Sequence, residues 1–374
     1  MRLSLLDRAR ALDPAIVGVT FGLLIFGLAA LMSASGPVAF QRTADSLFYV
    51  KRQLLAGILP GLGMFLLLSL INYRTWKRVA SLALVATFAL LLLVYIPGIG
   101  FKQGGAQSWA TIGGITFQPS EFAKLTFLVY LAAWLAERRG GKAHDVQEGL
   151  LPFAGTLGAV VFLLVMQPDT GSMAVIVGTS TLLYLVSGAP LVWFAGLTAL
   201  GAGLITLLVK LSPYRAARFM TFLHPELDPK GIGYHINQAI LAIGSGGILG
   251  LGYGKSRQKF LYLPEVEADS IFAVIAEEFG LVIVVCMIAA YAFLVWRCLR
   301  IAKTAKDPFG SYLAAGVGIW IAVQALVNMM SMSGLMPMTG VTLPLISHGG
   351  TSMVALLAGI GLVAGVPREN KFAL

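Results

Sequence analysis

Long apolar runs recur along the whole chain, and short polar segments separate most of them. A hydrocarbon core about 30 Å thick is crossed by roughly 20 helical residues, so runs of this length predict transmembrane helices. The pattern predicts an all-α membrane protein with about ten such helices. The predicted spans are residues 15–34, 52–71, 78–97, 118–137, 151–167, 171–187, 190–209, 271–296, 311–333 and 345–366.

Two of these runs, 151–167 and 171–187, are short and are separated only by the sequence Gln167-Pro168-Asp169-Thr170-Gly171. They predict either two helices joined by a sharp turn or one broken helix. The first run, 15–34, is long enough to span, and we expect a retained helix there and not a cleaved signal peptide. We therefore expect a single polytopic membrane domain over residues 1–374.

Lys and Arg residues are divided unequally between the segments that connect the spans. With ten spans, the side that carries both termini receives fifteen of the 27 basic residues, against four in the short loops opposite. Because basic residues are retained on the cytoplasmic side, we predict a multi-pass protein of the cytoplasmic (inner) membrane with both termini cytoplasmic. The fifteen are Arg2, Arg8, Arg10, Arg74, Lys77, Arg78, Arg138, Arg139, Lys142, Arg297, Arg300, Lys303, Lys306, Arg368 and Lys371, and the four are Arg42, Lys51, Arg52 and Lys102.

One connection, residues 210–270, is much longer than the others and is extracytoplasmic in this topology, between the seventh and eighth spans. It carries seven further basic residues, which do not contradict the topology because long loops translocate largely regardless of charge. Residues 233–243 show an amphipathic helical pattern, and six glycines lie between 244 and 254. We expect a short interfacial helix followed by a tight, glycine-shaped turn.

The composition agrees with a membrane protein and excludes other classes. Hydrophobic residues make up 57% of the chain and charged residues 12%, whereas a soluble domain is about a quarter charged. The net charge of +10 is explained by cytoplasmic basic residues and by attraction to anionic membrane lipid, and no soluble basic domain is present to bind nucleic acid. Cys286 and Cys298 lie in or near one apolar run and predict neither a disulfide nor a metal pair.

The long loop ends in the acidic sequence Leu263-Pro264-Glu265-Val266-Glu267-Ala268-Asp269-Ser270, directly before the span that starts at residue 271. One interpretation is helix capping, since Asp269 or Ser270 can cap and acidic residues suit a helix N-terminus. The other is a general base at the membrane surface, since a carboxylate can accept a proton from a sugar hydroxyl. Basic residues of the same loop would then hold a diphosphate leaving group. The two interpretations are compatible.

Some ionisable residues lie inside predicted spans, where charges are costly and usually face a partner or a cavity. Glu277 and Glu278 lie two turns into the eighth span, and both a structural pairing and a functional role stay open for them. The segment Gln118–Lys124 opens the fourth span, and Lys124 is one of the few cations well inside a predicted span. Its expected counter-charge is Glu121 or a glutamate of the eighth span, and we favour a structural ion pair.

Two further polar residues lie at the ends of spans. Asp169 belongs to the turn before the sixth span, where turn chemistry alone accounts for it. His348 precedes the last span, and we interpret it as a hydrogen-bonding residue and not as a proton carrier. The sequence contains no zinc-binding spacing, Walker loop, Rossmann fingerprint or nucleophile elbow, so it predicts no metal site and no means of using ATP.

Taken together, the order and spacing of these segments resemble the SEDS family (shape, elongation, division and sporulation) of RodA, FtsW and SpoVE. The resemblance covers nearly the whole chain. It rests on Gln118–Lys124, Gln167–Gly171, Gly233-Tyr234 with Gln238, Ala242–Gly247, Gln258-Lys259, Leu263–Glu265, Asp269 with Ile271–Glu278, and Leu343–Ser352.

The resemblance implies a peptidoglycan glycosyltransferase that polymerises lipid II, a disaccharide carried on undecaprenyl diphosphate. It also implies a class B penicillin-binding protein as transpeptidase partner, and an essential role for Asp269. Relatives commonly read His-Thr-Asp-Phe where this chain reads Glu267-Ala268-Asp269-Ser270, and they commonly have Tyr in place of His348. Between the division and elongation branches of the family, we favour division.

For the mechanism, we hypothesise that the growing glycan is the donor and that the 4-hydroxyl of a new lipid II attacks it with inversion. Asp269 removes the hydroxyl proton, and basic residues of the long loop stabilise the departing diphosphate. The candidates to bind substrate are Arg215, Arg218, Lys255, Arg257 and Lys259, together with Glu265 and Gln238. A divalent cation is a candidate to share this task, although the sequence shows no site for one.

Two other classes of function compete with the enzyme. In a lipid II flippase, Glu121, Lys124, Glu277 and Glu278 would line a path for the headgroup. A noncatalytic scaffold for division proteins would use the charged cytoplasmic ends. The long loop with its carboxylate favours the enzyme, because an enzyme needs only an outer site whereas a flippase needs a polar route through both leaflets.

Overall fold

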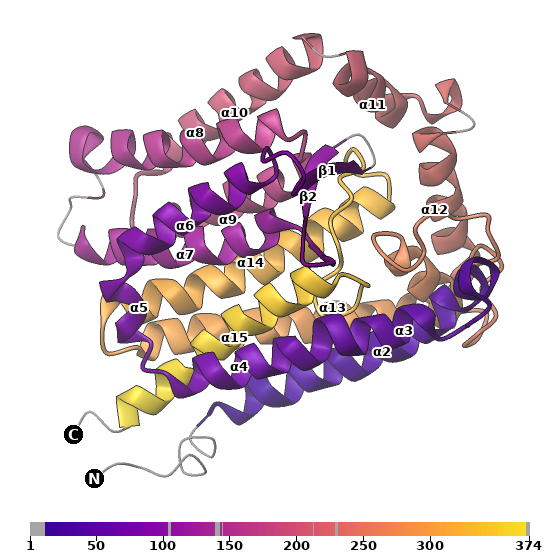
Figure 1. Ribbon diagram of the computed structural model, residues 1–374, viewed down its shortest axis with the longest axis horizontal. Helices are drawn as coiled ribbons and strands as arrows, with labels where there is room; N and C mark the ends of the chain where they lie inside the picture. The colour runs from indigo at the N-terminus through magenta and orange to yellow at the C-terminus, as the bar shows by residue number, and fades with distance from the viewer. Residues whose placement is uncertain are drawn as a thin grey trace.

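The computed structural model describes residues 12–103, 106–138, 143, 145–211, 213–228 and 231–371. A helix lies at each of the ten predicted spans (Figure 1). The helices are α2 (Pro14–Thr43), α3 (Phe48–Gln53), α4 (Leu59–Leu70), α5 (Arg74–Arg78), α6 (Ala80–Leu93), α7 (Pro119–Glu137), α8 (Leu151–Met166), α9 (Thr170–Val186), α10 (Leu191–Leu211), α11 (Pro213–Leu223), α12 (Ile232–Gly246), α13 (Ile271–Thr304), α14 (Pro308–Met332) and α15 (Gly350–Lys371). Short π-helical turns, Leu54–Ile58 and Val146–Leu150, precede α4 and α8, and a 3-10 turn, Pro225–Leu227, follows α11.

Length and apolar composition identify a multi-pass membrane protein. Among the described residues, six helices are long and apolar enough to cross a membrane: Pro14–Thr43, Phe48–Leu70, Val146–Met166, Ile271–Thr304, Pro308–Met332 and Gly350–Pro367. Shorter apolar helices occupy three more predicted spans, at Ala80–Leu93, Thr170–Val186 and Leu191–Leu204. The helical membrane fold is therefore confirmed, while the number of ten crossings stays a prediction.

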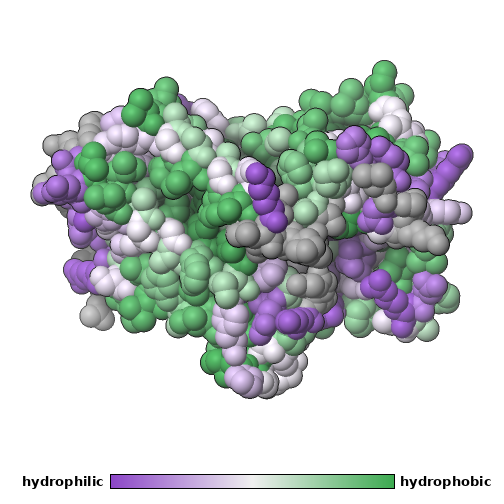
Figure 2. Space-filling view, turned by 90° about the horizontal axis from the view of Figure 1, so that it is seen from above, coloured by the Kyte–Doolittle hydropathy of each residue, from purple (hydrophilic) through white to green (hydrophobic). Residues whose placement is uncertain are grey.

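Apolar side chains cover the outside of several of these helices. Ile25, Leu82 and Phe162 are 68%, 64% and 63% exposed, as lipid-facing residues would be. Figure 2 shows hydrophobic residues over much of the middle of one face, with hydrophilic residues gathered toward its two ends. The 30 residues of α2 extend roughly 45 Å, so this helix projects beyond a hydrocarbon core of about 30 Å.

The two short apolar runs form separate helices, which answers the question that the sequence left open. The α8 helix ends at Met166, and α9 begins at Thr170. Asp169 is the N-cap residue of α9, and its carboxylate accepts a hydrogen bond of 3.0 Å from the Ser172 amide. The same carboxylate accepts a bond of 2.8 Å from the Ser120 hydroxyl at the start of α7, so the turn is held against a second helix.

The helices pack as a bundle in which neighbours in space are often distant in sequence. The α13 helix lies beside α14, α2 and α12, while α15 lies beside α4 and α7. On the other side, α14 contacts α7 and α9. Figure 1 shows α10 and α11 arching along one edge, and within the described residues α10 has few contacts besides those with α9 and α11.

A small antiparallel sheet, which the sequence analysis does not predict, follows α6. Its strands are β1 (Gly100–Gln103), β2 (Ala106–Ile112) and β3 (Ile115–Phe117), in the order β1-β2-β3. Ile112 pairs with Ile115 across the two-residue turn Gly113-Gly114, in which both glycines have positive φ. Two glycines between residues that pair in this way are typical of a tight hairpin.

Ion pairs join neighbouring segments at one end of the bundle. At the end where α2 begins, Asp13 pairs with Arg297 near the end of α13 at 2.5 Å, and Arg74 pairs with Asp307 at 3.4 Å. Figure 1 shows α15 ending on this side, and we call it the terminal end. The opposite end carries most of residues 210–270, and we call it the loop end. Within that segment, the predicted helix at 233–243 is confirmed as α12.

Candidate functional site

A break in α13 fixes the glycine-rich turn at the loop end. Gly280 has a φ of 70° and a ψ of −175°, so the helix is interrupted there. The carbonyls of Glu277 and Glu278 therefore accept hydrogen bonds of 3.0 and 2.9 Å from amides of the turn 247–254. A Cβ atom at position 280 would lie 2.3 Å from the backbone nitrogen of Gly250. Only glycine permits this close contact between the turn and the helix.

The side chains of Glu277 and Glu278 support the segment that follows the turn. Both residues are 1% exposed. Glu277 Oε1 accepts a hydrogen bond of 2.9 Å from the Arg257 amide. Glu278 Oε1 accepts one of 2.7 Å from Lys259 Nζ, and the Ser33 hydroxyl of α2 donates to the same carboxylate at 2.7 Å. These contacts give both glutamates a structural role.

From the sequence, Lys259 is expected to bind substrate, but its side chain pairs with Glu278. Its side chain is 4% exposed, and its charge is neutralised by Glu278. A buried and paired ammonium is not free to hold a diphosphate, so we assign Lys259 to the support of the loop. Lys255 and Arg257 are exposed. Both remain candidates to bind substrate.

Two other predicted substrate-binding residues, Arg215 and Arg218, lie on α11, and their side chains are outside the described part of the structure.

Asp269 lies directly before α13 and is 8% exposed. Its backbone carbonyl accepts a hydrogen bond of 2.9 Å from Asn328 on α14, and Asn328 also donates to the Val341 carbonyl at 2.7 Å. Burial, with a smaller contribution from the Glu265 charge, raises the pKa of the Asp269 carboxyl to about 7. This pKa suits a general base at physiological pH.

Helix capping does not explain the polar residues before α13. Ser270 occupies the N-cap position, but its side chain makes no capping hydrogen bond. Instead, Ser270 Oγ lies 2.6 Å from Nε2 of His235 on α12, and it donates to Asp269 Oδ1 at 3.4 Å. The α12 helix is thus connected through Ser270 to the candidate base.

A second group of polar side chains surrounds Glu267 at the end of α2. Arg42 Nη1 donates to Glu267 Oε1 at 3.2 Å and to the Tyr49 hydroxyl at 2.7 Å. The His348 amide donates to the Glu267 carbonyl at 2.8 Å, and the His348 ring packs edge-on against Tyr49. The Arg42 side chain is 56% exposed, so its guanidinium stays accessible beside the Asp269 segment.

Glu265 and Gln238 lie at the loop end, as predicted. Burial, followed by the charge of Glu267, raises the pKa of the Glu265 carboxyl. Gln238 is partly exposed on α12, three residues after His235, and therefore lies on the same side of that helix. Both residues remain substrate-binding candidates.

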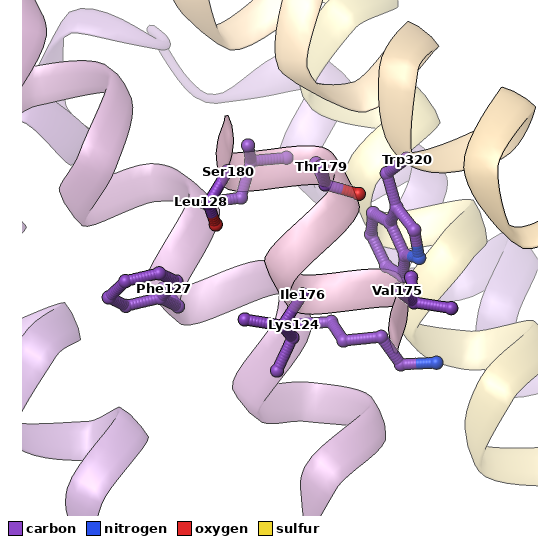
Figure 3. Close-up of a pocket in the computed structure, with 8 residues that line it drawn as sticks. All are labelled: Lys124, Phe127, Leu128, Val175, Ile176, Thr179, Ser180 and Trp320. Carbon is purple, nitrogen blue, oxygen red and sulfur yellow. The ribbon is translucent and has the colours of Figure 1, made fainter. Parts of the chain in front are cut away.

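The predicted ion pair on α7 is confirmed. Lys124 Nζ lies 2.7 Å from Glu121 Oε1 and also donates to Gln324 Oε1 of α14 at 3.3 Å. Figure 3 shows the Lys124 side chain beside a small cavity, which is lined largely by apolar side chains. The ring of Trp320 is part of this lining. The cavity has room for about one water molecule, so these polar residues form a paired cluster and not an open passage.

Sequence reasoning missed four residues of this site. His235 and Asn328 were detectable as polar residues in an amphipathic and an apolar helix, respectively. Arg42 and Tyr49 carried no local signal. In the part of the chain that the structure describes, no three or more His, Cys, Asp or Glu side chains are grouped as a metal site would require, and we assign no ligands for a divalent cation.

The fold and the site define a multi-pass helical membrane protein with a buried carboxylic acid at the loop end. The chain belongs to the FtsW, RodA and SpoVE family, described as cell cycle proteins, whose model matches residues 14–372. It is 38% identical to stage V sporulation protein E of Bacillus subtilis, over 96% of this chain and 98% of the relative. It is 39% identical to a probable peptidoglycan glycosyltransferase FtsW of Thioalkalivibrio sulfidiphilus, over 97% and 91%.

Solved structures of the family have the same fold. A chain from a study of how a peptidoglycan synthase complex coordinates polymerization and crosslinking matches with a TM-score of 0.78 at 30% identity, covering 96% of this chain and 98% of that one. The rod shape determining protein RodA of Thermus thermophilus matches with a TM-score of 0.68 at 30% identity, covering 96% and 97%.

Proposed function

We propose that the protein is a peptidoglycan glycosyltransferase that polymerises lipid II at the outer face of the cytoplasmic membrane, with Asp269 as general base. The observation that carries the proposal is the Asp269 carboxyl, buried at the loop end with its pKa raised to about 7. Family members with the name peptidoglycan glycosyltransferase FtsW support the same activity.

In the proposed reaction, the growing glycan is the donor and its reducing-end sugar is linked to undecaprenyl diphosphate. The Asp269 carboxylate accepts the proton of the 4-hydroxyl of an incoming lipid II. The hydroxyl oxygen forms the β-1,4 bond, the bond to the diphosphate breaks, and the diphosphate leaves with the electron pair. Because the base must be ionised, the rate should fall as the pH drops below about 7.

The departing diphosphate needs exposed cations close to the base. Lys255 and Arg257 are exposed in the same long loop as Asp269, and we propose them as candidates for this role. Arg42 is a further candidate, because its exposed guanidinium is held by Tyr49 at the end of α2. Arg215 and Arg218 keep their place as candidates from the sequence, whereas a divalent cation gains no support among the described side chains.

The orientation follows from charge and from the position of the site. Most basic residues of the connecting segments belong to the terminal end, which we assign to the cytoplasm with both chain termini. The loop end then faces outward, where the disaccharide headgroups of lipid II would be polymerised.

A class B penicillin-binding protein is the proposed partner. The likeness to a chain of a peptidoglycan synthase complex that coordinates polymerization and crosslinking supports a transpeptidase partner. Relatives with the name FtsW support the division side of the family over the elongation side.

The rival functions have less support. A flippase needs a polar path, but Lys124 and Glu121 are paired with each other and Glu278 is paired with Lys259. A noncatalytic scaffold gives no reason to bury a carboxyl with a raised pKa at the loop end.

The test is polymerisation of labelled lipid II by purified protein, with and without the cognate transpeptidase. We expect glycan chains from wild type and none from Asp269→Ala, whose Tm should stay at or above that of wild type. Asp45→Ala removes an exposed Asp at the same end and serves as the matched control. Equal chains from wild type and Asp269→Ala would exclude Asp269 as the base. No chains from wild type with a verified partner would favour the flippase or scaffold.

A further inference from the structure

His235, Ser270 and Asp269 form a chain of hydrogen bonds between α12 and the proposed base. Nε2 of His235 lies 2.6 Å from Oγ of Ser270, and this Oγ lies 3.4 Å from Oδ1 of Asp269. Ser270 is fully buried. Its hydroxyl is therefore shielded from solvent and must find its partners among these neighbours.

The number of protons available shows which atom donates in each of these hydrogen bonds. A serine hydroxyl has one proton to donate, and an ionised carboxylate can only accept. Burial lowers the pKa of His235 to about 4, so its ring is neutral at physiological pH and carries one N–H. An ionised Asp269 attracts the Ser270 proton more strongly than a neutral imidazole nitrogen does. The short contact between Ser270 and His235 then requires Nε2 to be the donor.

We propose that His235 is a positioning residue for Asp269: its Nε2–H donates to Ser270 Oγ, which directs the Ser270 hydroxyl onto the carboxylate. The inference rests on the proposed function of Asp269 as general base. Both donors of this series of hydrogen bonds point toward Asp269. The hydrogen bonds therefore stabilise the ionised base and do not carry its proton away. The remaining lone pairs of the carboxylate stay available to the substrate hydroxyl.

Other ionisable groups also face this region and must stay constant in a test based on pH. Asn328, the neighbour on α14, is neutral and binds the Asp269 backbone. The ionisable groups are Glu265 and Glu267 in the same segment, Arg42 at the end of α2, and His348 before α15. All four are unchanged in the variants below, so a difference in pH profile between variants reports on His235 and Ser270.

The test is the dependence of kcat on pH for polymerisation of labelled lipid II by the full-length protein with its transpeptidase. His235→Leu removes the donor, and we expect the acid limb of the profile to move up by about one pH unit, because the ionised base loses a hydrogen bond. At a pH below the limb, kcat should then fall by up to about tenfold, with recovery at higher pH. His235→Gln keeps an N–H donor and should restore much of the wild-type profile.

A double-mutant cycle separates this role from simple packing. Ser270→Ala should shift the profile as His235→Leu does, and the double variant should shift it no further, because the chain is already broken. His224→Gln changes an exposed histidine of the same long loop and is the control. An unmoved profile in His235→Leu, with or without a lower Tm, or fully additive shifts in the double variant, would overturn the proposal. Failure of the proposed function would appear differently, as full activity in Asp269→Ala.

Discussion

The assignment of Lys259 to structure and not to substrate makes a strong prediction. Lys259→Met keeps most of the length of the side chain but removes the charge that neutralises Glu278. Nζ of Lys259 lies 2.7 Å from Glu278 Oε1 and 3.0 Å from Ser33 Oγ, and both partners are buried. Removing one member of a buried pair leaves an uncompensated charge, so we expect a loss of about 3–5 kcal/mol in the free energy of unfolding.

A second substitution tests whether the loss comes from the stranded charge. Glu278→Gln, added to Lys259→Met, removes the remaining charge and keeps an amide oxygen that can accept from the Ser256 backbone, now 3.2 Å from Glu278 Oε1. Because replacing both members of a buried pair is often nearly neutral, the double variant should regain most of the lost stability. Lys255→Met removes an exposed cation four residues away and should leave stability within about 0.5 kcal/mol of wild type.

The assay compares thermal unfolding of the purified proteins in one detergent and at one scan rate, since membrane proteins often unfold irreversibly. Polymerisation is measured in parallel, well below the lowest Tm. A structural Lys259 lowers the Tm and is rescued in part by the second substitution. If Lys259→Met kept the wild-type Tm but polymerised no lipid II, the reasoning would be refuted and Lys259 would return to the substrate site.

Two further predictions concern the break in α13 and the base itself. Gly280→Ala should destabilise the protein by more than about 3 kcal/mol, because residue 280 has a φ of 70° and a Cβ there would lie 2.3 Å from the Gly250 nitrogen. The control is Gly158→Ala in α8, where a Cβ would have open space around it. This substitution should be neutral or slightly stabilising in the same unfolding assay. Asp269→Asn should abolish polymerisation yet raise stability at pH 8 by up to about 4 kcal/mol, because folding raises the pKa of Asp269 from 3.8 to about 7 and ionisation therefore opposes folding. The contribution of the Asp269 carboxyl to wild-type stability is fully present below pH 3.8 and is lost as the pH rises through 7. The gain in stability of Asp269→Asn over wild type should therefore shrink between pH 8 and pH 4, and a constant gain would contradict the raised pKa.

Much of the fold is visible in the sequence because its signals are local. Apolar runs place the helices, and the pattern at 233–243 with the glycines after it places α12 and the turn. The pair Glu121–Lys124 is also local, since residues three apart lie on one side of a helix. The sheet β1-β2-β3 is missed although its Gly-Gly turn is a local hairpin signal, because the surrounding apolar runs dominate the pattern.

The partners of the site residues are not visible in the sequence, because they lie far apart along the chain. Ser33 and Glu278 are separated by 245 residues, and Arg42 and Glu267 by 225. No periodicity relates such positions, so a basic residue in the long loop looks equally available to substrate whether it is exposed, as Lys255 is, or buried, as Lys259 is. Only the packing of α2 and α13 against the loop separates these cases.

The burial of Asp269 connects the stability of the site to its chemistry. Removal from water raises its pKa to about 7, which makes the carboxylate a better base and also makes its ionised form costly in the folded protein. The surrounding structure must therefore hold Asp269 in place against that cost. Asn328 binds its backbone from α14, and the break at Gly280 anchors the preceding loop to α13. A base with this pKa thus depends on the rigid support around it, and weakening the support should reduce activity before the bundle itself unfolds.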